Sequence, residues 1–464
     1  MVFSSLEFLF WFLPFCLLVY YLVPTRFENI SIFIFSLLFY AFGCLEQPVY
    51  ILLLLLSIGM NYLFGLWIDK TGSRRTLVLG LCYNFGFLVL FKYADFFIGN
   101  INAVSGFFGK DLAIPFTNFI LPIGISFYTF QAASYLIDVY WGDIPVETSL
   151  LKLGTYIVMF PQLIAGPIVR YSDVRKQLTD RTHNVTTLIE GIRYFVLGLS
   201  FKVLLANRLS GLWSAVQGIG FDSISVPLAW MGIVAYSLQL YFDFYGYSLM
   251  AIGLGKMLGF DFPENFKHPY MSKTMTEFWR RWHITLGTWF REYVYIPLGG
   301  NRKGTARTYW NLFCVWFFTG FWHGAAWNFI LWGLFLYVIM VIEKAVLYKV
   351  FNKSKVVGHI YMVILIPLSW LIFAVEDVKD IVVYAGRLIG LNGKYVYAGD
   401  YIKYFRNYGI FLAIGLLCAT DYPEKLLHRV NNKWAQVLIY LALFSGSVYC
   451  IWKGMNDPFM YFRF

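Results

Sequence analysis

Charged residues are scarce in this sequence of 464 residues. Asp, Glu, Lys and Arg make up 14% of the chain, whereas a soluble globular domain carries about 25%. Hydrophobic residues account for 59% and aromatic residues for 21%, and a surface of that composition would be insoluble in water. The composition excludes an ordinary soluble protein and predicts an all-α polytopic membrane protein.

The sequence also lacks the patterns of several other classes. The six cysteines are scattered without a Cys-x-x-Cys pair, so they support neither a disulfide framework nor a metal site. The net charge of +11 comes without zinc-finger spacing or an aromatic-basic RNA-binding pattern, so no nucleic-acid partner is expected. In a membrane protein, Lys and Arg concentrate in cytoplasmic loops, where anionic lipid headgroups attract them.

A basic leader with a small-residue cleavage site is missing at the N-terminus, so the first apolar run is expected to be an uncleaved span. The chain also has no long hydrophilic stretch and no internal repeat. Residues 1–464 are therefore expected to form a single integral-membrane domain. A span needs about 20 apolar residues, and about 12 crossings are expected among candidate runs at 7–24, 29–43, 48–68, 77–93, 119–140, 150–168, 186–206, 226–254, 308–322, 326–347, 357–375, 405–420 and 434–452.

Basic residues gather in four parts of the chain, at 70–75, 170–181, 256–307 and 425–433. Lys and Arg in short loops favour the cytoplasmic side. Placing all four parts there puts both termini outside the cytoplasm, which requires an even number of crossings. Membrane lipids are the expected surroundings.

Residues 261–307 do not read as a span, because prolines, charges and aromatic residues alternate there. From Thr276 to Arg291, apolar side chains recur at four-residue steps, as in an amphipathic helix. We expect a cytoplasmic-side interfacial or re-entrant segment. The alternative is an amphipathic surface anchor with no chemistry.

An ionisable group inside a membrane span is costly and usually functional, and His323 is such a group. It follows Arg307 by 16 residues, so a helix would carry it about 24 Å from the loop, deep in a hydrocarbon core about 30 Å thick. Small residues around it at 320 and 324–326 permit a helix break or a close backbone approach. Burial favours the neutral imidazole, a competent general base; the alternative is a histidine that hydrogen-bonds for helix packing.

His283 is the second candidate, beside Arg280, Arg281 and Glu277. Because cations and a carboxylate act on it in opposite directions, the sequence does not fix its protonation state. It is read as a second acid/base group or as a donor that orients a thioester carbonyl, and alternatively as an ordinary interfacial histidine. The two arginines suit phosphate groups and lipid headgroups equally well.

Two segments resemble the membrane-bound O-acyltransferase (MBOAT) family, within it most closely the bacterial alginate O-acetyltransferase type. They are FWRRWHITLGTWFREYVYIPLGGNR (278–302) and TGFWHGAAWNFILWGL (319–334). Segments 121–142, 160–174, 241–255 and 262–270 fit the same pattern, so the resemblance covers nearly the whole chain. It implies a fold of transmembrane helices around a central tunnel, with re-entrant or interfacial helices beside it.

The resemblance implies that His323 is the catalytic histidine and His283 its supporting partner. A cytoplasmic thioester, acetyl-CoA, would be the donor substrate, and no metal or other cofactor would be needed. The acyl group would leave on the other face towards a cell-surface polysaccharide, completed by an extracytoplasmic transferase of the SGNH type. The residues expected at the donor are Arg280, Arg281, Trp282, Trp322 and Asn328, with Trp322 or Asn328 donating to the oxyanion.

Two alternatives stay open. Leu249 stands where relatives acting on alginate often have an acid, and its segment also resembles the branch that transfers D-alanine to teichoic acid from a carrier protein. A lipid or polysaccharide transporter without covalent chemistry is the second, although it predicts internal repeats that this sequence lacks.

The last span and tail, residues 434–464, carry the final expectation. The tail MNDPFMYFRF is either an interfacial aromatic belt or, as the resemblance implies, a motif whose Tyr461 relays the acyl group as a phenolic ester. A phenol has a pKa of about 10 and needs a base before it attacks, which His323 would supply.

Overall fold

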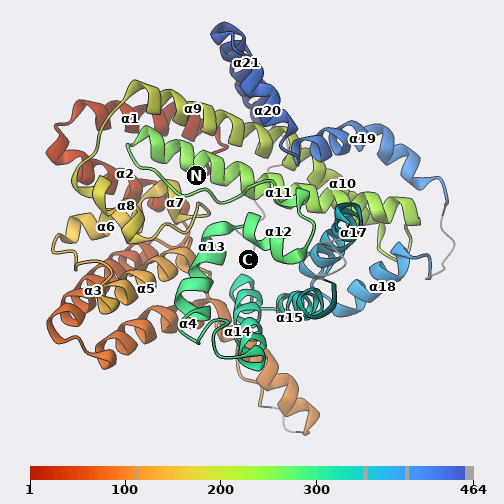
Figure 1. Cartoon of the computed structure of the whole chain (residues 1–464), viewed down its shortest axis with the longest axis horizontal. Helices are drawn as coiled ribbons and strands as arrows, with labels where there is room; N and C mark the ends of the chain where they lie inside the picture. Colours follow the sequence, from red (N-terminus) through yellow and green to blue (C-terminus); the bar gives the residue numbers. More distant parts are fainter. Residues whose placement is uncertain (110–111, 348–353, 392–396, 455–464) are drawn as a thin grey trace. The chain divides into compact units, whose positions relative to one another are not determined.

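The computed structural model describes residues 1–109, 112–347, 354–391 and 397–454 (Figure 1). Within these residues the regular structure is helical, with one isolated antiparallel bridge between Phe266 and Trp282. The all-α expectation is confirmed. The tail that carries Tyr461 lies outside the described residues.

Six helices in the described part of the chain are long and apolar enough to cross a membrane. They are Thr25–Gly43, Val49–Thr71, Arg74–Phe107, Trp327–Leu347, Val356–Ala374 and Lys433–Trp452. A shorter apolar helix covers Phe8–Leu22. The protein is therefore a multi-pass membrane protein, and the larger expected number of about 12 crossings stays a prediction.

Two expected spans differ from the observed helices. The run at 119–140 becomes helical only at Ile125, after Gly124 with a positive φ of 72°. The run at 150–168 is interrupted at Met159, whose ψ of 111° is not helical. Pro161 follows in the first turn of the next helix, where its missing N–H costs no hydrogen bond.

One compact unit comprises residues 1–192 and 251–263. Its elements are η1 (Phe8–Phe12), α1 (Leu13–Leu22), η2 (Thr25–Phe27), α2 (Glu28–Gly43), α3 (Val49–Thr71), α4 (Arg74–Phe107), α5 (Ile125–Trp141), α6 (Leu150–Val158), α7 (Phe160–Leu163), α8 (Tyr171–Thr179) and the start of α9 (Val185–Ser200). The buried amides of Asn61 in α3 and Asn84 in α4 donate to each other at 2.9 and 2.7 Å. Such reciprocal hydrogen bonds between amides join helices whose apolar faces alone would give little specificity to helix pairing in lipid.

The other unit comprises residues 193–250 and 264–464. Its elements are η3 (Phe201–Ala206), α10 (Asn207–Ile219), most of α11 (Val226–Met257), η4 (Pro269–Met271), α12 (Met275–Arg281), α13 (Ile284–Phe290), η5 (Arg291–Tyr295), α14 (Thr305–His323), α15 (Trp327–Ile342), η6 (Glu343–Leu347), α17 (Lys355–Ala374), α18 (Val378–Leu388), α19 (Asp400–Cys418), α20 (Tyr422–Arg429) and α21 (Lys433–Trp452). Both candidate histidines belong to this unit.

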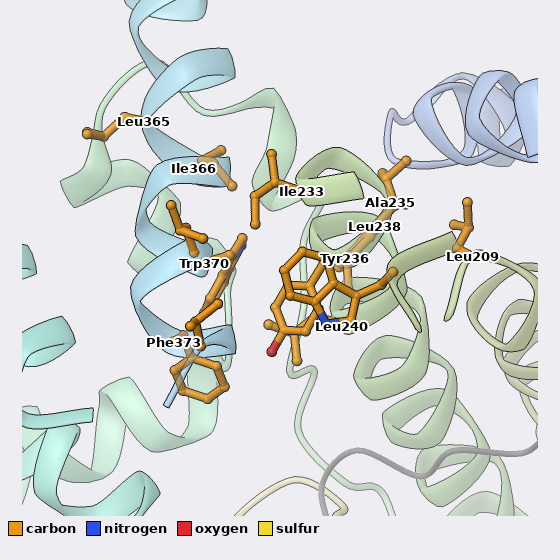
Figure 2. Packing of buried hydrophobic residues seen from close by; sticks show 14 of the residues in the cluster. Leu209, Ile233, Ala235, Tyr236, Leu238, Leu240, Leu365, Ile366, Trp370 and Phe373 are labelled. Carbon is orange, nitrogen blue, oxygen red and sulfur yellow. The ribbon is translucent and has the colours of Figure 1, made fainter. Parts of the chain in front are cut away.

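A large apolar core holds this second unit together. Figure 2 shows Ile366 and Trp370 of α17 opposite Ile233 and Tyr236 of α11. The same cluster extends to Trp332 of α15, whose side chain has no exposed surface. Fully buried aromatic rings contribute large contact areas, so the helices around the histidines are held by close packing.

The amphipathic helix expected from Thr276 to Arg291 is not continuous. The segment forms α12 and α13 with a break at Trp282 and His283, where His283 takes a left-handed backbone conformation with φ 46° and ψ 54°. A four-residue apolar spacing fits one unbroken helix and also two short consecutive helices, so the pattern did not reveal the break.

Candidate active site

The break between α12 and α13 places His283 at the N-terminus of α13. A left-handed conformation is uncommon for a residue other than glycine, although histidine is among the residues enriched there. Conformations of this kind are retained where the surroundings enforce them, and they cluster at functional sites. The His283 side chain is 2% exposed.

Asn265 enforces this geometry from a neighbouring loop. Its backbone carbonyl accepts the Ile284 N–H at 2.9 Å, and its Oδ1 accepts the Thr285 N–H at 3.2 Å and the Thr285 hydroxyl at 2.9 Å. The first N–H groups of a helix have no partner within the helix. Asn265 therefore caps α13, a task that His283 does not perform with its own side chain.

The same Oδ1 lies 3.1 Å from Nδ1 of His283. On the other side, the ring of Phe244 stands edge-on to the imidazole at 4.7 Å between centroids. Burial lowers the pKa of His283 to about 3 because an apolar environment disfavours the charged ring. The imidazole is therefore neutral at physiological pH.

His323 is the last residue of α14, and the helix ends there because Gly324 is extended, with φ −166° and ψ 158°. Its side chain is 7% exposed. Three aromatic rings surround the imidazole, with centroids at 5.0 Å for Trp322, 5.1 Å for Trp332 and 5.4 Å for Phe373. The helix break that the small residues predicted is confirmed, and it makes His323 the C-terminal residue of α14.

Trp322 contacts both histidines. Its ring centroid lies 5.0 Å from that of His323 and 6.3 Å from that of His283. Two histidines that are 40 positions apart in the sequence therefore share one aromatic neighbour. The two side chains that were expected to be catalytic therefore lie near the same indole.

Two glycines allow α14 to approach α15 closely, and the two helices lie side by side in Figure 1. A Cβ on Gly320 would come within 2.4 Å of the Phe329 carbonyl oxygen, and a Cβ on Gly333 within 2.4 Å of the Trp316 carbonyl oxygen. Real side chains do not tolerate such distances. The close approach that was expected near His323 is confirmed at Gly320.

A cavity of about 1340 Å³ lies against α12, α13 and α14. Its wall includes His283 and the indoles of Trp279 and Trp282. Basic side chains also line it, namely Arg280, Arg291, Arg302, Lys303 and Lys344. An apolar cavity with cationic groups suits a ligand that combines an apolar or amide-bearing arm with phosphate groups.

Glu343 secures the wall of this cavity. Its carboxylate is buried in η6 and accepts the N–H groups of Met275 and Thr276, at 2.5 and 3.1 Å, and the Thr276 hydroxyl at 3.0 Å. A carboxylate satisfies the unpaired N–H groups and the positive end of a helix N-terminus. The helix that carries Arg280 is thus fixed to the continuation of α15.

The other residues expected at the donor make the following contacts. Arg281 forms an ion pair with Glu277 at 2.7 Å. Trp282 is buried and stacks on Phe278, with centroids 5.5 Å apart. The Asn328 amide nitrogen donates to the Phe373 carbonyl at 3.1 Å, while its Oδ1 has no partner in the described residues.

Of the expected site residues, Arg280, Trp282 and His283 line the cavity. Arg281, Trp322, His323 and Asn328 are outside the described wall. Within the described residues, His, Cys, Asp and Glu form no group of three or more that could hold a metal ion.

Sequence reasoning missed two polar residues of this site. Glu343 lies in an apolar run, so the criterion that singled out His323 would also have found it. Asn265 belongs to a segment noted only for its resemblance, and nothing local marks its contact with a histidine 18 positions away.

The sequence is similar to several known acyltransferases. The sequence profile of the MBOAT, membrane-bound O-acyltransferase family, matches residues 143–375. The probable alginate O-acetylase AlgI of Pseudomonas putida is 43% identical over 499 aligned positions, which cover 100% of both chains. The peptidoglycan O-acetyltransferase of Helicobacter pylori is 34% identical, over 85% of this chain and 80% of its own. The teichoic acid D-alanyltransferase of Bacillus subtilis is 30% identical, over 48% of this chain and 59% of its own.

The chain belongs to the membrane-bound O-acyltransferase family. It is an enzyme that transfers acyl groups to hydroxyl oxygens, as the sequence motifs around the two histidines predicted.

Proposed function

We propose that this enzyme transfers an acetyl group from a cytoplasmic thioester, acetyl-CoA, to a hydroxyl group for delivery to a cell-surface or secreted polysaccharide. Two relatives that align over most of their length carry names of O-acetyl transfer, one to alginate and one to peptidoglycan. Since those polymers differ, the proposal extends to a polysaccharide acceptor and not to a particular polymer.

One observation carries the proposal most directly. A cavity with five basic side chains has His283 in its wall, and Trp322 joins that histidine to His323. The basic groups would hold the donor's phosphates, chiefly through Arg280. The thioester end would then lie on the side of the histidines.

His323 would act as the general base. The acceptor hydroxyl oxygen bonds to the acetyl carbonyl carbon, the C–S bond breaks, and the electron pair leaves with the thiolate. His323 takes the hydroxyl proton and returns it to the thiolate, so no net proton is consumed. Such proton transfer contributes about 10²–10⁴-fold to a rate.

The proposal also includes an orientation in a bacterial cytoplasmic membrane. The basic wall of the cavity would face the cytoplasm, as expected for loops rich in Lys and Arg, and both termini would lie outside it. The acetyl group would cross within the protein, through a tunnel, towards an extracytoplasmic SGNH-type transferase that completes delivery to the polysaccharide.

Donor consumption by the purified full chain in lipid nanodiscs tests the proposal. We expect the protein to release thiol from acetyl-CoA, and His323→Ala to lower that rate by about 10²–10⁴-fold. His359→Ala is the matched control, because His359 is an exposed histidine on α17. A rate that does not depend on His323 would contradict the proposed base.

The same assay separates the alternatives. A D-alanyl transferase would consume a D-alanyl thioester on a carrier protein and leave acetyl-CoA intact. A transporter would show no consumption of either donor that depends on His323.

A further inference from the structure

We infer that Asn265 fixes His283 as the tautomer protonated on Nδ1, so that Nε2 presents a lone pair to an N–H or O–H group of the bound substrate. Asn265 is a positioning residue in this role, since it acts through His283. The inference rests on the proposed function, in which His283 lies in the wall of the donor cavity. It assigns this histidine one role, that of a hydrogen-bond acceptor for the substrate.

The first step concerns the amide of Asn265, whose oxygen and nitrogen look alike to most methods. Here the backbone N–H of Thr285 can only donate, and it points at the atom assigned as Oδ1, 3.2 Å away. The neighbouring Ile284 N–H donates to the Asn265 backbone carbonyl at 2.9 Å. An amide nitrogen in the Oδ1 position would face a donor, so the assignment of Oδ1 is chemically required.

The second step concerns the imidazole. Since Oδ1 only accepts, Nδ1 of His283, 3.1 Å away, must carry the hydrogen. A neutral imidazole has one N–H, so Nε2 is the acceptor. Burial keeps the ring neutral, because the pKa of His283 is lowered to about 3.

The third step concerns what Nε2 meets. This atom is buried and has no hydrogen-bond partner in the described residues, although His283 belongs to the wall of the cavity. A buried acceptor without a partner is costly, and a bound ligand that brings an N–H or O–H would satisfy it. A neutral His283 of this tautomer cannot donate to a thioester carbonyl, so the reading of His283 as an orienting donor is disfavoured.

Asn265→Asp and Asn265→Ala separate a tautomer effect from simple loss of the helix cap. Aspartate keeps an acceptor for Nδ1 and for the α13 N–H groups, and it sacrifices only Nδ2, which has no partner in the described residues. Its negative charge should raise the pKa of His283 by about 1–3 units. We therefore expect Asn265→Asp to transfer acetyl groups but to lose activity progressively as the pH falls, an acid limb that the parent lacks.

Asn265→Ala removes the partner of Nδ1, and partners that orient a functional histidine typically contribute about 10–100-fold to activity. The fall should appear in kcat. Thr285→Val is the matched control, since it removes the hydroxyl bond to the same Oδ1 and leaves the contact with Nδ1 in place. If Asn265→Asp and Asn265→Ala were equally inactive while both fold, the role would be structural and the inference overturned.

Nitrogen-15 NMR of histidine-labelled full chain in nanodiscs gives a readout without any substrate. The His283 resonances are assigned by difference with His283→Gln. At pH 7 we expect a protonated Nδ1 and an unprotonated Nε2. A hydrogen on Nε2, or on both nitrogens, would overturn the inference. This result does not depend on which donor the enzyme uses, so it can fail or succeed independently of the proposed acetyl transfer.

Discussion

Gly320 of α14 and Gly333 of α15 lie so close that a Cβ on either residue would stand 3.2 Å from the Cα of the other. Small residues of this kind let transmembrane backbones approach each other. The contact lies three residues before His323, at the end of α14. The position of His323, the proposed base, therefore depends on two residues that have no side chain.

Gly320→Ala should separate the two helices, because its methyl group would meet the Phe329 carbonyl. Overpacking of this kind costs about 1–3 kcal/mol, and we expect a lower thermal unfolding temperature together with slower acetyl transfer. Gly86→Ala in α4 is the matched control, since nothing lies within 4 Å of its would-be Cβ. Equal stability of the two variants would show that α14 and α15 can rearrange freely.

Glu343→Ala should weaken the donor side specifically. It leaves the N–H groups of Met275 and Thr276 without their acceptor, at a cost of about 1–3 kcal/mol. Because α12 carries Arg280, we expect a higher KM for acetyl-CoA, measured by thiol release. Glu343→Gln keeps one acceptor oxygen and should be affected less. Glu376→Ala, at an exposed carboxylate, serves as the control, and an unchanged KM in Glu343→Ala would contradict the link.

Arg280 and Arg281 provide an internal comparison, because only Arg280 lines the described cavity while Arg281 is paired with Glu277. We expect Arg280→Gln to raise the KM for acetyl-CoA by up to about fivefold, the range of a solvent-exposed charge pair. Arg281→Gln should change it less. The difference should shrink at high salt, where exposed charges are screened; a larger effect at Arg281 would assign the phosphates to another position.

Tyr461 remains a prediction from the resemblance, because it lies outside the described residues. If it relays the acyl group, incubation with acetyl-labelled acetyl-CoA should add label to the C-terminal peptide in a mass spectrum. Tyr461→Phe should abolish transfer and leave folding intact, and His323→Ala should abolish the label. Full transfer by Tyr461→Phe would remove the relay from the mechanism.

The sequence predicted the helical membrane fold and singled out both histidines as candidates for local reasons. An apolar run that contains a single histidine and nearby glycines can be recognised without the tertiary structure. The helix break after His323 can be predicted from the same glycines. The number of crossings is harder to predict, because runs such as 150–168 are largely apolar, yet the helix is interrupted at Met159. Helices buried inside the protein and helices that face lipid contain the same apolar residue types, so composition alone does not tell which of them cross the membrane.

The tautomer of His283 could not be predicted, since it depends on an asparagine 18 positions earlier. The left-handed backbone conformation of His283 could not be predicted either, because a four-residue apolar spacing does not indicate it. Both features arise from pairing between the loop around Phe266 and the link between α12 and α13. Such pairing is a property of the folded chain.

The helix α15 and its continuation η6 make one contact at each of two levels. Gly333 sits against the end of α14 near His323, and ten residues further on Glu343 holds the start of α12 beside the cavity. A helix rises 1.5 Å per residue, so these contacts are about 15 Å apart along one stiff rod. The helix thus sets a fixed distance between the level of His323 and the level of the cavity. If the donor binds in this cavity and His323 is the base, the thioester arm has to span that interval, so donors with a shorter arm should be poor substrates.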